Sequence, residues 1–478
     1  MPESLKEKSG AAFFWNFLDK GGQQAIQLVF LTALARLLTE DDFGMLTVLA
    51  IFTAVANILQ ESGFSAALIR KKDVCEADYS SVFYFNIAIS LFIYSLFYFS
   101  SPLIAAYYER PELTGLSRVI FLSFVFNAFG IIQNVHLYRR MDFRSNTGIT
   151  LTAGLISGIA AILMAYSGYG VWSLAVQAVL QPFIRSLLLW IVIKWRPSLL
   201  FSYDRLKSMA TYSFKLLATS IFNQATAYVY PMIIGKSFSM KQVGYYGQAN
   251  KLNTIPQSII SESIQGVAYP LLTQLDNEER LRRIFRRFVR MASFICFPVA
   301  MLLIITAQPV VEIVLSEKFL RSAPILQLLA VSGAAYPLYV LSGALMKAIG
   351  KSGLLLKSDL IRNALLIASA LITCRLGILA MVVGYSAVYI FSLAVSFYFS
   401  GKEISYRLSS VFGDMFPYIA ISLLVFLPLY FLRYAIDNNW LLLTLQVIIG
   451  SSGYLSAVKL LGSRVMEDCW QFVKNKRI

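Results

Sequence analysis

Long runs of apolar residues, separated by short polar turns, follow one another along almost the whole chain. A run of about twenty such residues is long enough to cross the hydrocarbon core of a bilayer as a helix. Only helices and closed barrels satisfy all their backbone groups in lipid, and these runs lack the alternation of barrel strands. The pattern therefore predicts an all-α polytopic membrane protein. Fourteen spans are expected, near 12–37, 43–68, 82–107, 115–136, 147–167, 170–193, 211–235, 243–268, 289–314, 323–346, 357–375, 378–400, 412–434 and 440–461.

The polar positions of residues 21–62 return two hundred residues later, at 221–262. Few residues are identical, but Gly44 matches Gly244 and amides recur in the same register. Each copy also has an acid near the end of its second helix, Glu61 in one and Glu262 in the other. An even number of spans separates the copies, so both have the same orientation in the membrane. Parallel repeats of this kind are a standard transporter architecture, with the substrate site between the halves. We therefore expect two six-helix lobes, 1–207 and 208–402, related by a parallel pseudo-two-fold axis, and an appended helix pair and tail, 403–478.

Composition and charge agree with a membrane location. The 478 residues are 57% hydrophobic and only 14% charged, about half the charged fraction of a soluble domain. With the N-terminus on the cytoplasmic side, the predicted inside segments hold most of the 42 lysines and arginines. This distribution follows the positive-inside rule. The net charge of +16 is therefore a topology signal and not a nucleic-acid patch, and both termini are expected in the cytoplasm.

No catalytic or metal-binding pattern is found. The four cysteines are scattered, and His136 is the only histidine, so we interpret it as an isolated residue of an interfacial loop. Two Gly-Lys-Ser triplets, ending at Ser237 and Ser352, lack the earlier glycine of a phosphate-binding loop. The N-terminus also lacks the short apolar core and cleavage site of a removable leader. The sequence predicts a protein that is not an enzyme, with no cofactor and no metal.

A basic segment precedes the ninth expected span. Arg283, Arg286, Arg287 and Arg290 recur at helical spacing with apolar residues between them, which is typical of an interfacial helix. The segment is either an anchor linking the two lobes or a surface that gathers anionic lipid headgroups.

Charged residues inside the spans are the strongest functional signal. A charge at mid-helix costs ~2.5–3.5 kcal/mol, so it usually faces a bundle interior or a wet path. Arg362 lies near a span end, where it could snorkel, and Asp359 is explained as its local helical partner. Glu61 and Glu262 are either counter-charges or a coupling-ion site. The expected substrate-binding cations of a central cavity are Lys20, Arg185, Lys215 and Lys251.

Amides and tyrosines gather in the first, second, seventh and eighth spans. Interhelical hydrogen bonds, worth ~0.6 kcal/mol each, explain some of them, but so many on one quartet would exceed that role. A cavity lined by amides, phenols and a few cations suits an anionic, hydroxyl-rich ligand such as a sugar attached to a phosphate. The expected cavity-lining residues are Gln24, Gln27, Asn57, Asn223, Gln224, Tyr228, Gln248, Asn250 and Asn253.

Several short motifs resemble a known family. They are Leu5-Lys6-Glu7-Lys8, Ala35-Arg36-Leu37-Leu38-Thr39, Phe43-Gly44, Gly63-Phe64 and Ala66-Ala67-Leu68-Ile69-Arg70-Lys71. With these motifs most of the chain resembles the Wzx-type polysaccharide flippases of the multidrug/oligosaccharidyl-lipid/polysaccharide superfamily, in the branch of colanic-acid and teichuronic-acid exporters. The resemblance implies a two-lobed transporter with a cationic cavity, which moves polyprenyl-diphosphate-linked oligosaccharides to the outer leaflet by alternating access.

We therefore expect a multi-pass flippase of the cytoplasmic (inner) membrane that serves surface-polysaccharide assembly. Its expected partners are the lipid-linked oligosaccharide and membrane lipids, with other assembly proteins left open and no nucleic acid. Three alternatives remain: a cation-coupled drug antiporter of the same superfamily, a flippase for the peptidoglycan precursor, and a scaffold without transport. Bases outnumber acids within the spans, which argues against the antiporter, and the cost of buried charge argues against the scaffold.

Overall fold

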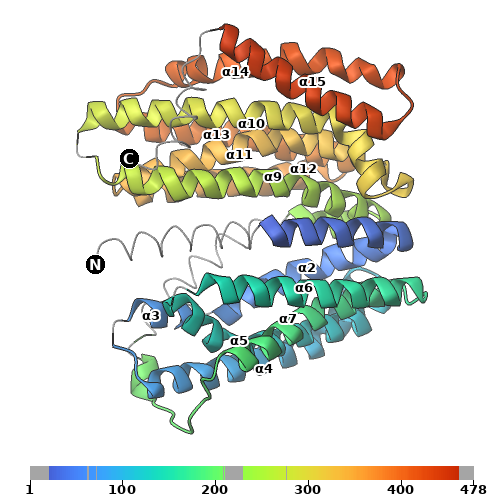
Figure 1. The fold of residues 1–478 in the computed structure, drawn as a ribbon, viewed down its shortest axis with the longest axis vertical. Coiled ribbons are helices and arrows are strands. Elements are labelled where there is room, and N and C mark those ends of the chain that lie inside the picture. Colours follow the sequence, from blue (N-terminus) through green and yellow to red (C-terminus); the bar gives the residue numbers. More distant parts are fainter. Residues whose placement is uncertain are drawn as a thin grey trace. The chain divides into compact units, whose positions relative to one another are not determined.

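The computed structural model describes residues 21–61, 64–71, 73–140, 142–207, 209, 230–275 and 277–461. These ranges are almost entirely helical and contain no strand (Figure 1). A helix over 21–37 comes first. It is followed by α2 (Glu40–Glu61), α3 (Phe64–Arg70), α4 (Glu76–Tyr107), α5 (Glu112–Arg140), α6 (Phe143–Tyr166), α7 (Trp172–Val192), α9 (Met240–Leu272), α10 (Glu278–Val314), α11 (Ser322–Ala348), α12 (Ser352–Thr373), α13 (Ile378–Glu403), α14 (Leu408–Tyr430) and α15 (Asn439–Leu460).

The predicted all-α membrane architecture is confirmed. Within the described ranges, nine helices are long and apolar enough to cross a bilayer. Most other expected spans also coincide with a helix, although those helices carry more polar residues. The expected span 211–235 lies largely outside the described residues, so the number fourteen stays a prediction.

The chain divides into two compact units, one ending at Gly244 and the other beginning at Tyr245. In the first unit α5 is central, because it packs on α4, α7 and α2, while α6 packs on α7. The buried Gln60 of α2 donates hydrogen bonds to Ser90 Oγ of α4 and to the Phe124 carbonyl of α5. Gln60 is therefore an interhelical contact. The expected lobes 1–207 and 208–402 stay a prediction.

The second unit repeats the pairing of the first. There α10 packs on α11, α11 on α13, and α12 on α13, in the order in which α4, α5, α6 and α7 pair in the first unit. The same four-helix arrangement thus occurs twice along the chain, which agrees with the internal repeat expected from the sequence.

The last helix pair has no equivalent in this pattern. Both α14 and α15 lie against α10 and against each other (Figure 1). The contact buries Ile421 and Phe426 of α14 and Tyr454 of α15 together with Ile305 of α10. The Tyr454 hydroxyl also donates to the Phe294 carbonyl at 3.0 Å. The pair is therefore a packed part of the second unit.

The basic segment that was expected to be an interfacial helix is not a helix of its own. These arginines form the first third of α10, which continues without a break for 37 residues. The reason is packing: the apolar residues Leu281, Phe285 and Val289, four apart, are buried against other helices of the unit. At 1.5 Å per residue α10 is about 55 Å long, so it exceeds the ~30 Å hydrocarbon core.

Candidate functional site

Arg185 is the centre of a polar cluster inside the first unit. Its guanidinium on α7 donates to Asn134 Oδ1 of α5 at 3.0 Å and to Asn146 Oδ1 of α6 at 3.3 Å. Its Nε lies 3.5 Å from the Thr150 hydroxyl of α6. Three helices thus hold one half-buried cation through neutral groups. The two asparagine amides and the threonine hydroxyl can each also donate a hydrogen bond to a ligand or accept one from it.

A small pocket of about 30 Å³, room for about one or two water molecules, adjoins this cluster. It marks where polar side chains converge and is too small to hold a sugar as it stands. Thr150 belongs to both, because it contacts Arg185 and lines the pocket. On α7, Gln177 and Gln181 precede Arg185 at intervals of four residues, so the three side chains lie along one face of the helix. The pocket is lined by Gln23, Ile26, Gln27, Phe30, Thr150, Leu151, Gly154, Gln177 and Gln181.

The chemistry of this site suits an anionic, hydroxyl-rich group. The guanidinium offers donors in a planar fork that matches phosphate oxygens. The glutamine amides supply both donors and acceptors, which sugar hydroxyls require. We therefore take the Arg185 cluster with its glutamine pocket as the candidate functional site of the first unit.

Helix α9 holds the corresponding predicted residues of the second unit. Lys251 and Asn250 are half-buried, whereas Gln248 and Asn253 are buried. Asn253 lies against α11, because a Cβ built on Gly333 would be 2.6 Å from its Oδ1. Among the described residues, the side-chain carbonyl oxygens of Gln248 and Asn253 accept no hydrogen bond.

The snorkelling interpretation expected the Arg362 side chain to extend to the membrane surface. Instead, the side chain lies inside the second unit. Its side chain on α12 is only 14% exposed, and its guanidinium pairs with Asp359 at 3.1 Å. The guanidinium carbon also lies 4.7 Å from the ring centroid of Tyr339 on α11, whose hydroxyl donates to Asp359 at 2.8 Å. The carboxylate and the ring hold the cation inside the unit. The local pair with Asp359 is confirmed.

His136 is not a loop residue. It lies in α5, where its ring stacks on Tyr79 with centroids 4.3 Å apart and lies 5.5 Å from the Trp195 ring. Two aromatic neighbours explain why a histidine is accommodated there.

The remaining predicted residues are distributed as follows. Gln24 is half-buried on the first helix, Asn57 and Glu262 are exposed, and Glu61 ends α2. Glu262 also has an interaction partner. Five predicted residues lie outside the described ranges: Lys20, Lys215, Asn223, Gln224 and Tyr228.

Sequence reasoning missed five polar residues of the candidate site: Asn134, Asn146, Thr150, Gln177 and Gln181. The row Gln177-Gln181-Arg185 was visible as an i, i+4, i+8 spacing on one expected span. Asn134 and Asn146 gave no such signal, because they lie on other helices and meet Arg185 only through tertiary packing.

Comparison with known proteins identifies the family. The model of the family described as "Polysaccharide biosynthesis protein" matches residues 33–324. The chain belongs to this family. Its expected place among the Wzx-type transporters of the multidrug/oligosaccharidyl-lipid/polysaccharide superfamily is confirmed.

Two family relatives and one solved structure illustrate the similarity. The succinoglycan biosynthesis transport protein ExoT of Rhizobium meliloti (strain 1021) is 26% identical over 66% of this chain, and the match spans 65% of ExoT. The teichuronic acid biosynthesis protein TuaB of Bacillus subtilis (strain 168) is 26% identical over 74% of each chain. The lipid II flippase MurJ, in an inward closed conformation, shares the fold with a TM-score of 0.77 at 17% identity, covering 94% of this chain and 98% of MurJ.

Proposed function

We propose that this protein is a flippase that translocates polyprenyl-diphosphate-linked oligosaccharide units across the cytoplasmic membrane by alternating access. Family membership supports transport for polysaccharide biosynthesis rather than an enzymatic step. The observation that carries the ligand class is Arg185, held by three neutral groups beside a pocket lined by glutamines. The guanidinium would bind the diphosphate, and the glutamines would bind sugar hydroxyls.

The four cationic residues expected from the sequence belong to this proposal. Lys20, Arg185, Lys215 and Lys251 would contact the diphosphate, while Glu61 and Glu262 would balance charge or bind a coupling ion. The polyprenyl chain would remain in lipid. Cytoplasmic termini and a location in the inner membrane complete the proposal, since the basic residues concentrate in the segments expected on that side.

Reconstitution into liposomes with a labelled lipid-linked oligosaccharide tests the proposal. Appearance of the glycan at the opposite leaflet is followed with a membrane-impermeant glycosidase. We expect Arg185→Gln to slow translocation about ten- to hundredfold, because a charge-assisted hydrogen bond contributes ~1.5–3 kcal/mol. Arg185→Lys, which keeps the charge and loses the planar fork, should have an intermediate rate.

Arg118→Gln is the matched control. Arg118 is a second arginine of the first unit, and it donates to Ser101 at 3.0 Å and lies over the Tyr98 ring. It lies on α5 sixteen residues before Asn134, about 24 Å along the helix. Equal rates for the Arg185 and Arg118 variants, at equal protein level, would contradict the assigned role of Arg185. Absence of glycan translocation by the unaltered protein would contradict the flippase function itself.

A further inference from the structure

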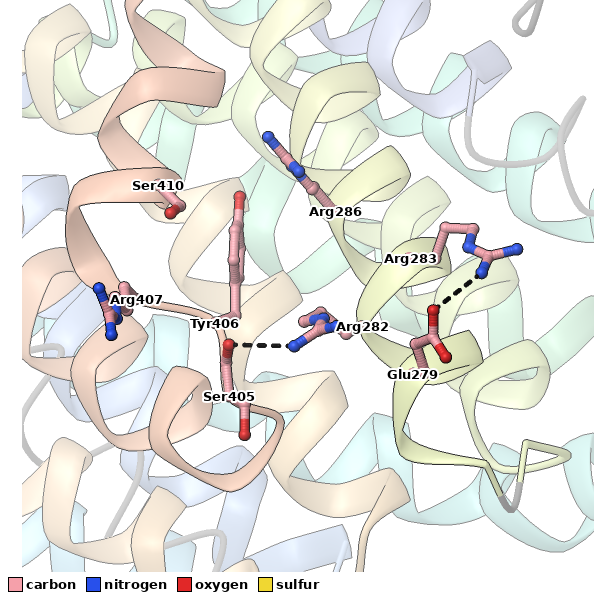
Figure 2. Close-up of a pocket in the computed structure, with 8 residues that line it drawn as sticks. All are labelled: Glu279, Arg282, Arg283, Arg286, Ser405, Tyr406, Arg407 and Ser410. Carbon is pink, nitrogen blue, oxygen red and sulfur yellow. Dashed lines mark hydrogen bonds and ion pairs between the residues drawn. The ribbon is translucent and has the colours of Figure 1, made fainter.

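A second cationic pocket lies in the second unit, and none of the residues assigned to transport lines it. It has a volume of about 360 Å³ and lies between the start of α10 and the turn that joins α13 to α14. This is within the range of about 300–1,000 Å³ of small-molecule sites. Its lining residues are Glu279, Arg282, Arg283, Arg286, Ser405, Tyr406, Arg407 and Ser410, with the α10 residues on one side and the turn on the other (Figure 2).

Positive charge exceeds negative charge in this pocket. Four of its lining residues are arginines and one is a glutamate. That glutamate, Glu279, pairs with Arg283 at 3.2 Å. Among the described residues, Arg282 and Arg407 have no carboxylate partner: Arg282 reaches only the Ser405 carbonyl, at 3.4 Å. The pocket therefore has guanidinium groups to offer to an anion.

Arg286 of the pocket is held in place by a buried carboxylate, Asp414, that does not line the pocket. Asp414 of α14 accepts hydrogen bonds from Arg286 through two nitrogens, and from Arg290. The Asp414 carboxylate is 5% exposed, whereas Arg286 and Arg290 are 47% and 42% exposed. One buried carboxylate thus positions two guanidiniums while leaving their outer faces accessible. A side chain fixed in this way loses less entropy when it binds a ligand.

The opposite wall of the pocket is a tight turn that depends on an uncommon backbone conformation and on a close backbone contact. Ser405 has a φ of 52°, a left-handed conformation that is uncommon outside glycine. The Tyr406 amide donates to the Gly401 carbonyl at 2.8 Å. A Cβ on Gly401 would overlap the Tyr406 carbonyl. The turn therefore folds closely over the end of α13, and this position brings Ser405 and Arg407 to the pocket.

The pocket lies where both of its helices become fully apolar. On α10, Arg290 is the last charged residue before the uncharged stretch 291–311. On α14, Asp414 is the last before the uncharged stretch 415–432. Stretches of this length fill the hydrocarbon core, so the arginines lie at the depth of the lipid headgroups.

We propose that this pocket is a binding site for the phosphate or diphosphate headgroup of a membrane lipid. Arg282, Arg286 and Arg407 would bind the phosphate oxygens, with hydroxyl donors from Ser405 and Ser410. Planar guanidiniums match the geometry of these oxygens. Neither Arg185 nor Lys251 lines this pocket, and the proposal does not depend on the transported cargo.

Lipid titration of the purified full-length protein, followed by native mass spectrometry, tests the proposal. The probes are phosphatidic acid, a polyprenyl diphosphate and inorganic diphosphate. Arg282→Gln with Arg407→Gln removes two pocket cations and leaves the Asp414 network intact. Arg280→Gln with Arg287→Gln is the matched control, because both residues are exposed on α10, lie outside the pocket lining and remove the same charge.

We expect the pocket variant to bind phosphatidic acid and polyprenyl diphosphate about tenfold or more weakly than the control variant. Equal affinities of the two variants would overturn the site. Binding of inorganic diphosphate at the pocket without any lipid effect would assign it to a free anion and overturn the lipid assignment. Should the double variant not fold, Ser410→Asp places a carboxylate at the pocket with all arginines kept. Unchanged lipid affinity in that variant would also overturn the proposal.

Discussion

Gly44 and Gly244 are reciprocal contact points of α2 and α9. A Cβ on Gly244 would lie 3.2 Å from the Gly44 amide nitrogen and would overlap the Glu40 carbonyl. A Cβ on Gly44 would overlap the Met240 carbonyl. Gly44 thus meets Met240, four residues before Gly244, and Gly244 meets Glu40, four residues before Gly44. Both the two glycines and the two residues they meet are two hundred positions apart in the sequence. The glycines matched in the sequence repeat are also partners in space.

Alanine at either glycine should force the two helix starts apart. We expect Gly44→Ala and Gly244→Ala each to destabilise the protein by about 1–3 kcal/mol, the usual cost of overpacking. Thermal unfolding in detergent measures the effect. Gly148→Ala is the control, since a Cβ there meets nothing within 4 Å. An unfolding midpoint for Gly44→Ala equal to that of the control would contradict the close approach.

Asp414→Asn should weaken the second unit by about 1–3 kcal/mol. The substitution leaves Arg286 and Arg290 without their carboxylate, but both are more than 40% exposed, so water compensates in part. The free energy of unfolding measures the effect, and Asp437→Asn in the exposed turn before α15 is the control. Equal stability of the two variants would show that the network contributes little.

Tyr406 gives the stability of the protein a dependence on alkaline pH. Burial, together with the hydrogen bond that the hydroxyl donates to Asp414, raises the pKa of Tyr406 above its ordinary value of about 10. The folded state then keeps a proton that the unfolded state loses, so this contribution is complete below a pH of about 10 and falls as the pH rises. Tyr406→Phe should flatten the decline of unfolding free energy above that pH. Identical slopes for both proteins would contradict the prediction.

Substitutions of Gln181 and Gln60 should have different effects, one on translocation and the other on stability. Gln181→Leu removes an amide from the candidate pocket, so we expect slower glycan translocation at unchanged stability. Gln60→Leu removes two interhelical hydrogen bonds, so we expect a loss of about 1 kcal/mol with unchanged translocation per folded molecule. Each variant serves as the control for the other. The reverse pattern would contradict both assignments.

Hydropathy predicted the helices well because a bilayer requires long apolar runs whatever the tertiary packing. It could not predict whether the arginines before residue 291 form a separate helix. The answer depended on tertiary packing. Neighbouring helices bury Phe285, so this segment packs within the second unit and does not lie on a membrane surface by itself. Local spacing explained Asp359 beside Arg362 but not the depth of the pair, since Tyr339 comes from another helix.

The candidate site was predicted only in part. Arg185 and Gln27 were identified because a charge or an amide within a span needs an explanation. Their neighbours Asn134 and Asn146 become visible only when the pairing of α5, α6 and α7 is known, and helix rotation is set by packing rather than by hydropathy.

The helix pair that covers α10 makes the two repeats unequal in their exposure to lipid. By pairing order α4 is the counterpart of α10, yet Phe92, Phe99 and Leu103 of α4 are 69%, 77% and 70% exposed. At 32 residues α4 is about 48 Å long, well above the thickness of the hydrocarbon core. Hydrophobic mismatch would therefore act directly on α4, while α14 and α15 shield α10. A change in bilayer thickness should therefore act more strongly on α4 than on α10, although the two helices are counterparts in the repeat.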